Sequence, residues 1–157
     1  MSGRKSRNKG ARGERELVNI LRDNGIEARR AGPAQRSGSA NFPDVIHEGY
    51  AAEVKYRNSI SLGAAIAALE QAEEYKEPGV THYAAIKITG SRLGWHVIVR
   101  VGVLIDAILS ASVSGKRTYK EIVGSLGNNW FSWRVAVVDG FAILPLDDWI
   151  HIIKARG

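Results

Sequence analysis

The sequence has no cysteine and no apolar run close to the length that spans a bilayer. Without cysteine there are no disulfide bonds and no thiolate metal sites, which agrees with a reducing, cytoplasmic setting (host cytoplasm for a viral protein). A membrane-spanning helix needs about 20 apolar residues, so we expect no membrane partner. Residues 1–12 lack the apolar stretch of a secretory signal, although their basic, acid-free composition leaves an organelle transit peptide open.

Acidic residues are scarce at the start of the chain. Residues 1–36 hold ten lysines and arginines against four acids, whereas residues 37–157 hold twelve of each sign, so the net charge of +6 lies in the first quarter. A local positive field favours a polyanionic partner, nucleic acid before membrane, although a solubilising tail would have the same charge. The length of 157 residues predicts one domain. We place it at residues 11–157, behind a flexible basic arm at residues 1–10.

Hydrophobic periodicity and turn residues divide the domain into helices and strands. Helices are expected at residues 11–24, 62–76, 103–110 and 147–156. Strands are expected at 26–30, 42–47, 50–56, 82–88, 95–101, 134–138 and 141–144; 31–41 is typical of a loop and 117–127 is ambiguous. This order predicts an α/β fold with a mixed sheet flanked by helices. Residues 130–133 (WFSW) are expected in the core first, at a dimer surface second and in base stacking third.

The first helix carries a carboxylate on its apolar face. Leu17, Val18 and Leu21 form a stripe at helical spacing, and Glu14 precedes them by three, four and seven residues. A carboxylate that faces the core is costly unless something pairs with it, so Glu14 is a candidate functional residue. The alternative is a structural glutamate in the first turn, where the helix dipole favours negative charge.

Two further carboxylates lie on the hairpin expected around Glu48-Gly49. A two-residue turn there, with Gly49 at positive φ, puts Asp44 opposite Glu53, with Lys55 following on the same face. Like charges that face each other destabilise a sheet unless a cation such as Mg²⁺, which prefers oxygen ligands, lies between them. The alternative is a solvated sheet face with a Glu–Lys pair. By composition, roughly one chain in twenty of this length contains such a spacing by accident.

Pro43-Asp44 with Glu53-Val54-Lys55 resembles the PD-(D/E)xK nuclease signature. Within that superfamily the chain is more closely similar to Holliday junction resolvases of the archaeal type. The resemblance covers about residues 9–76, and the loop at 31–41 departs from the family in detail. Further residues carry it: the Gly/Arg-rich lead with its glutamate at residues 9–17 (KGARGEREL), Arg30, Ser37-Gly38-Ser39, and Gln71 in the helix after the lysine strand.

The resemblance implies a restriction-endonuclease-like fold and a Mg²⁺-dependent endonuclease, with Mn²⁺ expected to substitute. Asp44 and Glu53 would be direct metal ligands, with the Val54 carbonyl a third, and Glu14 would complete the site directly or through water. Lys55 would orient the attacking water or stabilise charge on the phosphate. The cut would leave 5′-phosphate and 3′-hydroxyl ends. Gln71 could reach the site from its helix, or be structural.

The expected activity is the resolution of four-way DNA junctions by a homodimer, since two symmetric cuts need two sites related by a two-fold axis. Alternatives are another PD-(D/E)xK nuclease of the restriction, nicking or repair type, and a DNA-binding module that makes no cut. Ser37 and Ser39 are either ligands of phosphate or ordinary loop serines. The residues expected to contact DNA are Arg4, Lys5, Arg7, Lys9, Arg12, Arg15, Arg29, Arg30, Arg36, Ser37, Ser39 and Arg57.

Overall fold

The computed structural model describes residues 2–32, 42–90, 94–113 and 136–156. In chain order its elements are α1 (Ser2–Asp23), β1 (Ala28–Arg30), β2 (Val45–His47), β3 (Tyr50–Arg57), α3 (Leu62–Glu73), β4 (Thr81–Ile88), β5 (Trp95–Arg100), α4 (Val101–Val113), β6 (Ala136–Val138), β7 (Phe141–Pro145) and α6 (Leu146–Arg156). The strands form one sheet in the order β1-β2-β3-β4-β5-β7-β6. β3 and β4 pair in parallel, and the other neighbours pair antiparallel. The mixed sheet flanked by helices is confirmed.

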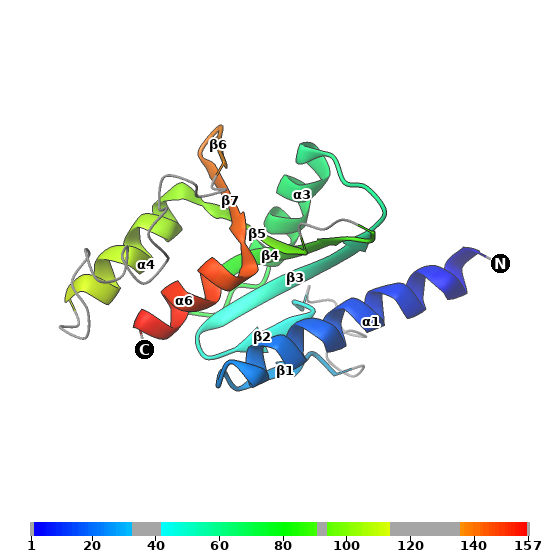
Figure 1. The fold of residues 1–157 in the computed structure, drawn as a ribbon, viewed down its shortest axis with the longest axis horizontal. Coiled ribbons are helices and arrows are strands. Elements are labelled where there is room, and N and C mark those ends of the chain that lie inside the picture. Colours follow the sequence, from blue (N-terminus) through cyan, green and yellow to red (C-terminus); the bar gives the residue numbers. More distant parts are fainter. Residues whose placement is uncertain (1, 33–41, 91–93, 114–135, 157) are drawn as a thin grey trace.

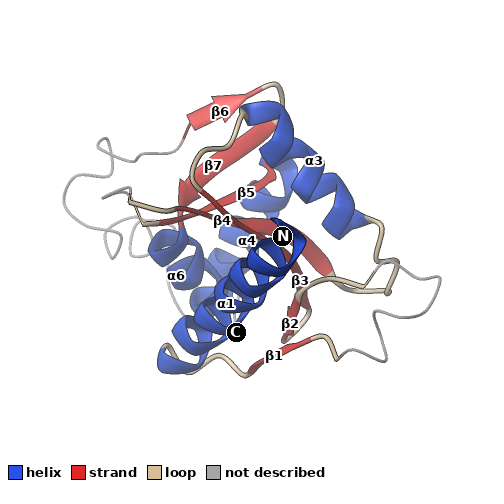
Figure 2. Cartoon of the chain, turned by 90° about the vertical axis from the view of Figure 1, so that its right-hand side faces the viewer, coloured by secondary structure: helices blue, strands red, loops and turns tan. Residues whose placement is uncertain are grey.

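Helices cover both faces of the sheet, as Figures 1 and 2 show. On one face, side chains of α1, α4 and α6 pack against β2, β3, β4 and β5 in the larger core cluster. On the other face, α3 alone of the described helices packs Ala65, Ala68 and Leu69 against Ala84, Ile86 and Ile98 of the central strands. β3 therefore has a helix on each side, and side chains that alternate along it point to different layers.

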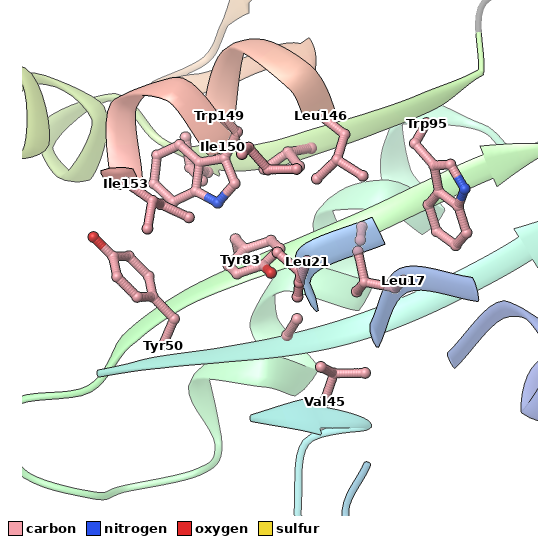
Figure 3. Close-up of a cluster of buried hydrophobic side chains, with 14 of the residues drawn as sticks. Leu17, Leu21, Val45, Tyr50, Tyr83, Trp95, Leu146, Trp149, Ile150 and Ile153 are labelled. Carbon is pink, nitrogen blue, oxygen red and sulfur yellow. The ribbon is translucent and has the colours of Figure 1, made fainter. Parts of the chain in front are cut away.

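Aromatic and branched side chains fill the larger cluster (Figure 3). Trp149 of α6 is fully buried, with its ring 5.6 Å from that of Tyr83 and 5.9 Å from that of Tyr50. His47 is buried beside them, with Nε2 2.7 Å from the Tyr83 hydroxyl, and burial lowers its pKa to about 4. His47 is thus a neutral core residue. No helix in the described residues is both long and apolar enough to cross a membrane.

The first helix begins earlier than the sequence indicates. It starts at Ser2, so residues 2–10, expected as a flexible arm, are its first turns, and they extend past the sheet (Figure 1). No proline interrupts this segment, and Lys9 ties it to the sheet by donating from Nζ to Asn58 Oδ1 at 2.6 Å. Farther along, a Cβ at Gly13 would come within 3.0 Å of Tyr56 Cβ and 3.3 Å of Val54 Cγ1. Glycine therefore lets α1 approach β3 closely just where Glu14 follows.

Other element boundaries differ by a few residues. β1 and β2 are both shorter than expected. β2 starts only at Val45, after Pro43, because proline has no N–H to donate to a ladder. α4 is longer than expected, and runs from Val101 to Val113. The ambiguous segment 117–127, the aromatic cluster 130–133 and the first two residues of the expected strand 134–138 lie outside the described residues.

Candidate active site

The β2–β3 hairpin has the register that a two-residue turn imposes. His47 pairs with Tyr50 across a turn in which Gly49 has φ +74°, a conformation that favours glycine. Beyond the ladder, Asp44 donates its backbone N–H to Ala52 O at 3.0 Å. Its carboxylate Oδ2 in turn accepts the Val54 N–H at 2.9 Å. These two bonds hold the Asp44 side chain against the adjacent strand.

Asp44 and Glu53 form a close acidic pair. Glu53 is only 4% exposed, on the side of β3 that faces α3. Burial and the charge of Asp44 raise the pKa of Glu53 to about 7, and so does the hydrogen bond that protonated Glu53 donates to Asp44. Lys55 opposes this rise without cancelling it. The site thus holds a carboxylate that is hard to ionise in the metal-free protein.

A lysine and a glutamine complete this side of the site. Lys55 Nζ lies 2.8 Å from Glu53 Oε1 and donates a second hydrogen bond to Gln71 Oε1 at 3.2 Å. Because an ammonium can only donate, Gln71 must present its oxygen to Lys55. Gln71 thus contacts Lys55 from its helix, and the two bonds fix the position of the Lys55 ammonium.

Glu14 faces inward, as its place on the apolar stripe predicts. It is 5% exposed, and its Oε2 accepts from Arg30 at 2.8 Å (Nε) and 2.7 Å (Nη2). Arg30 therefore neutralises most of the cost of burying this carboxylate. Arg30 comes from β1, so the pair also joins α1 to the edge of the sheet.

One open cleft of about 590 Å³ gathers the acids and the lysine. Its walls come from α1 and from β3 and the residues that follow it. The lining residues are Lys5, Lys9, Gly10, Glu14, Asp44, Glu53, Val54, Lys55, Tyr56, Arg57, Asn58 and Ser59. The lining combines three acidic side chains with four basic ones (Lys5, Lys9, Lys55 and Arg57), so the cleft offers cations to a ligand that is itself an anion.

The other expected DNA contacts are more scattered. Arg12 lies over the Tyr56 ring at 5.9 Å from its centroid, next to the cleft. Arg15 and Arg29 are exposed on α1 and β1. Outside the described residues or side chains lie Arg4, Arg7, Arg36, Ser37 and Ser39.

Sequence reasoning missed two sets of residues. Asn58 and Ser59 line the cleft directly after the end of β3. The signal that could have found them is their position just after the strand that carries Glu53 and Lys55. Glu16 pairs with Lys87 and accepts from Trp95 Nε1 at 3.1 Å, which joins α1 to β4 and β5. No local sequence pattern predicts the pair of Glu16 and Lys87, because the two residues are about 70 positions apart.

The cleft offers some, but not all, of the ligands that a divalent cation needs. Among the described side chains, no group of three or more acids or histidines lies close enough to hold an ion together. The carboxylates of Asp44 and Glu53 nevertheless lie close together, and Val54 lines the same cleft between Glu53 and Lys55. One or two carboxylates with water and phosphate oxygens are the usual surroundings of protein-bound Mg²⁺, so this donor set suits a hard cation.

Comparison with known proteins identifies the family. Residues 5–101, more than half of the chain, match the family described as archaeal Holliday junction resolvase (Hjc). Among solved structures the chain is similar to Hjc of Archaeoglobus fulgidus, a Holliday junction resolvase from an archaeal hyperthermophile. The identity is 24% and the TM-score 0.40, over 55% of this chain and 72% of that one. No curated protein matches. By the family match, the chain belongs to the archaeal Holliday junction resolvases, a family of nucleases that act on DNA junctions.

Proposed function

We propose that this protein is a structure-selective endonuclease that resolves four-way DNA junctions by Mg²⁺-dependent hydrolysis of phosphodiester bonds, in the cytoplasm of its source. The observation that carries the proposal is the crowding of Asp44 and Glu53 beside the Lys55 ammonium, 2.8 Å from Glu53, in the cleft that Glu14 also lines. Buried carboxylates with a perturbed pKa and a charged partner in a cleft are typical of catalytic sites.

Asp44, Glu53 and the carbonyl of Val54 would hold Mg²⁺, and Mn²⁺ would replace it. Such an ion would supply positive charge beside the phosphoryl oxygens and would make a nearby water more acidic. Glu14 would complete the acidic wall, directly or through water. Its pairing with Arg30 favours the route through water, because Arg30 already uses one of its oxygens.

Lys55 would act on the attacking water or on the scissile phosphate. Its ammonium has three protons, and the hydrogen bonds to Glu53 and Gln71 use two of them. The third remains for a water or a phosphate oxygen in the cleft, where it would stabilise negative charge that develops during hydrolysis. Gln71 is a positioning residue in this scheme, since it reaches the reaction only through Lys55.

The basic residues in and around the cleft would bind DNA. Lys5, Lys9 and Arg57 line the cleft, and Arg12 lies beside it, over the Tyr56 ring. Phosphate contacts of this kind do not read sequence, which suits an enzyme that selects DNA by shape. We include a homodimer in the proposal because the two opposed cuts of a junction need two active sites related by a two-fold axis.

The test is cleavage of an end-labelled mobile four-way junction and of a linear duplex of equal length, each with Mg²⁺ and with EDTA. The wild type should cut the junction symmetrically, only with Mg²⁺, and in preference to the duplex. Glu53→Ala should abolish cutting and keep binding. Glu48→Gln is the matched control, because Glu48 is exposed at the other end of the same hairpin, and it should cut like the wild type.

The results separate the alternatives. Equal cutting of junction and duplex would point to a general nuclease of the same superfamily. Binding without Mg²⁺-dependent cutting would instead leave a DNA-binding module. Light scattering of the protein in solution at working concentration tests the homodimer, and a monomer that still cuts both strands symmetrically would contradict it.

A further inference from the structure

Asn58 lines the same cleft as Asp44 and Glu53, at the end of strand β3. It follows Arg57, the last residue of β3, and lines the cleft together with Lys9 and Ser59. A smaller hollow of about 220 Å³ shares the lining residues Lys55, Arg57 and Ser59. The two hollows therefore adjoin, and form a path that runs from the acidic pair past Lys55 toward the polar residues after β3.

The contacts of Asn58 fix which way its amide points. Its Oδ1 lies 2.6 Å from Lys9 Nζ and 2.5 Å from Thr89 Oγ1. Since an ammonium has no acceptor, the amide oxygen must face Lys9, and the amide nitrogen must point elsewhere. Within the described part of the chain, that nitrogen has no hydrogen-bond acceptor. The two N–H groups of this exposed residue, which lines the cleft, are thus available to a ligand.

The surroundings of this amide carry positive charge. Lys9 is bound to it, Lys5 and Arg57 line the same cleft, and Lys9 also lies over the Tyr56 ring at 5.6 Å. An acceptor that meets the two N–H groups would also meet these cations. A phosphate oxygen has this chemistry, because it accepts hydrogen bonds and is negatively charged.

We propose that Asn58, oriented by Lys9 and Thr89, forms with Lys9 a binding subsite for a DNA phosphate next to the scissile one. This inference rests on the proposed function. It adds an uncharged hydrogen-bond donor to the basic residues that are proposed to bind DNA in the cleft. Asn58 donates from its amide nitrogen, and Lys9 contributes both a hydrogen bond and charge. The pair holds the backbone in register, so that the neighbouring phosphate lies before Lys55 and the acids.

The experiment measures binding of a labelled four-way junction in EDTA, and its cleavage in Mg²⁺. Asn58→Asp keeps an oxygen for Lys9 and Thr89, and replaces the donor with an acceptor that repels phosphate. Asn19→Asp makes the same change at an exposed position of α1 outside the lining of the cleft. Because hydrogen bonds to charged groups are strong, we expect Asn58→Asp to raise the Kd at least about tenfold. Asn19→Asp should raise it less than about twofold, as expected for one distant charge.

A second variant separates the hydrogen bond from charge. Asn58→Ala removes a neutral group, so it should weaken binding and leave the dependence of log Kd on log salt unchanged. Lys9→Met should reduce that slope by about one. Asn58 is exposed, so both of its variants should fold, and circular dichroism with urea denaturation checks this.

Each result has one meaning. If Asn58→Asp binds and cuts like Asn19→Asp, while the wild type cuts junctions, Asn58 only holds Lys9 and the subsite is refuted, with the proposed function intact. If Asn58→Ala lowers the salt slope as Lys9→Met does, the same conclusion follows. If the wild type neither binds nor cuts DNA, the proposed function fails, and the subsite fails with it.

Discussion

Replacing Glu53 with glutamine should make the metal-free protein more stable. The pKa of Glu53 is raised from 4.5 to about 7, first by burial and then by Asp44, so the folded protein disfavours the ionised form. A tenfold change in the ionisation constant is worth about 1.4 kcal/mol, and the full rise corresponds to ~3 kcal/mol at a pH above 7. Glutamine is neutral at every pH and close in shape. We therefore expect Glu53→Gln to gain between about 1 and 3 kcal/mol at pH 8.

The sign of the pH dependence follows from the same shift. Below pH 4.5 Glu53 is protonated in both folded and unfolded states, and it contributes no penalty. As the pH rises from 4.5 to about 7, the unfolded state loses its proton first, and the wild type becomes less stable relative to the variant. Above about pH 7 the difference should stay constant. Urea denaturation in EDTA at pH 4, 6 and 8 measures it as the difference in unfolding free energy between the two proteins.

Magnesium should remove most of this difference, and reverse it where the variant's gain is small. An ion bound at Asp44 and Glu53 stabilises the folded wild type by about 2.7 kcal/mol at a hundred times its Kd, and should stabilise Glu53→Gln much less. Glu48→Gln, at the exposed turn of the same hairpin, should match the wild type in every condition. The reasoning is refuted if Glu53→Gln is less stable than the wild type at pH 8 in EDTA, or if their difference does not change with pH.

Three further predictions use other residues. Lys55→Met should lower single-turnover cleavage at least about a hundredfold and leave the Kd for the junction within a few-fold; an equal loss of both would make Lys55 a binding residue. The pKa of His47 is about 4 when folded and 6.5 when unfolded, so its neutral burial should cost stability as the pH falls below 6.5, by ~3 kcal/mol near pH 4. His47→Phe should flatten this acid loss in urea titrations. Glu16→Gln should cost about 1 kcal/mol at neutral pH, and a double-mutant cycle with Lys87→Met should assign most of it to that pair.

Much of the candidate site could be predicted because it depends on local geometry. The period of the first helix places Glu14 with Leu17 and Leu21, and the two-residue turn at Gly49 sets the hairpin register. Both are properties of a few consecutive residues. The family match agrees with the restriction-endonuclease-like fold that the resemblance implied.

The missed features depend on contacts between distant parts of the chain. Arg30 is the partner of Glu14, but in the sequence it was one of ten basic residues assigned to DNA. The first helix starts at Ser2 because tertiary contacts such as Lys9 with Asn58 support its early turns, and local propensity alone marks such an end poorly. The polar role of Asn58 required knowing that this helix passes over the end of β3.

The geometry also bears on the two interpretations that the sequence left open for Glu53. A solvated Glu–Lys pair would leave Glu53 exposed, and a purely structural ion pair would lower its pKa. Instead Glu53 is 4% exposed, and its pKa is raised to about 7 although Lys55 lies 2.8 Å away. The Lys55 ammonium does not compensate the buried Glu53 beside the half-buried Asp44, so the metal-free fold carries an electrostatic cost. A cation bound at Asp44 and Glu53 would remove that cost, and the raised pKa of Glu53 in a cleft therefore supports the proposal of a metal-dependent catalytic site.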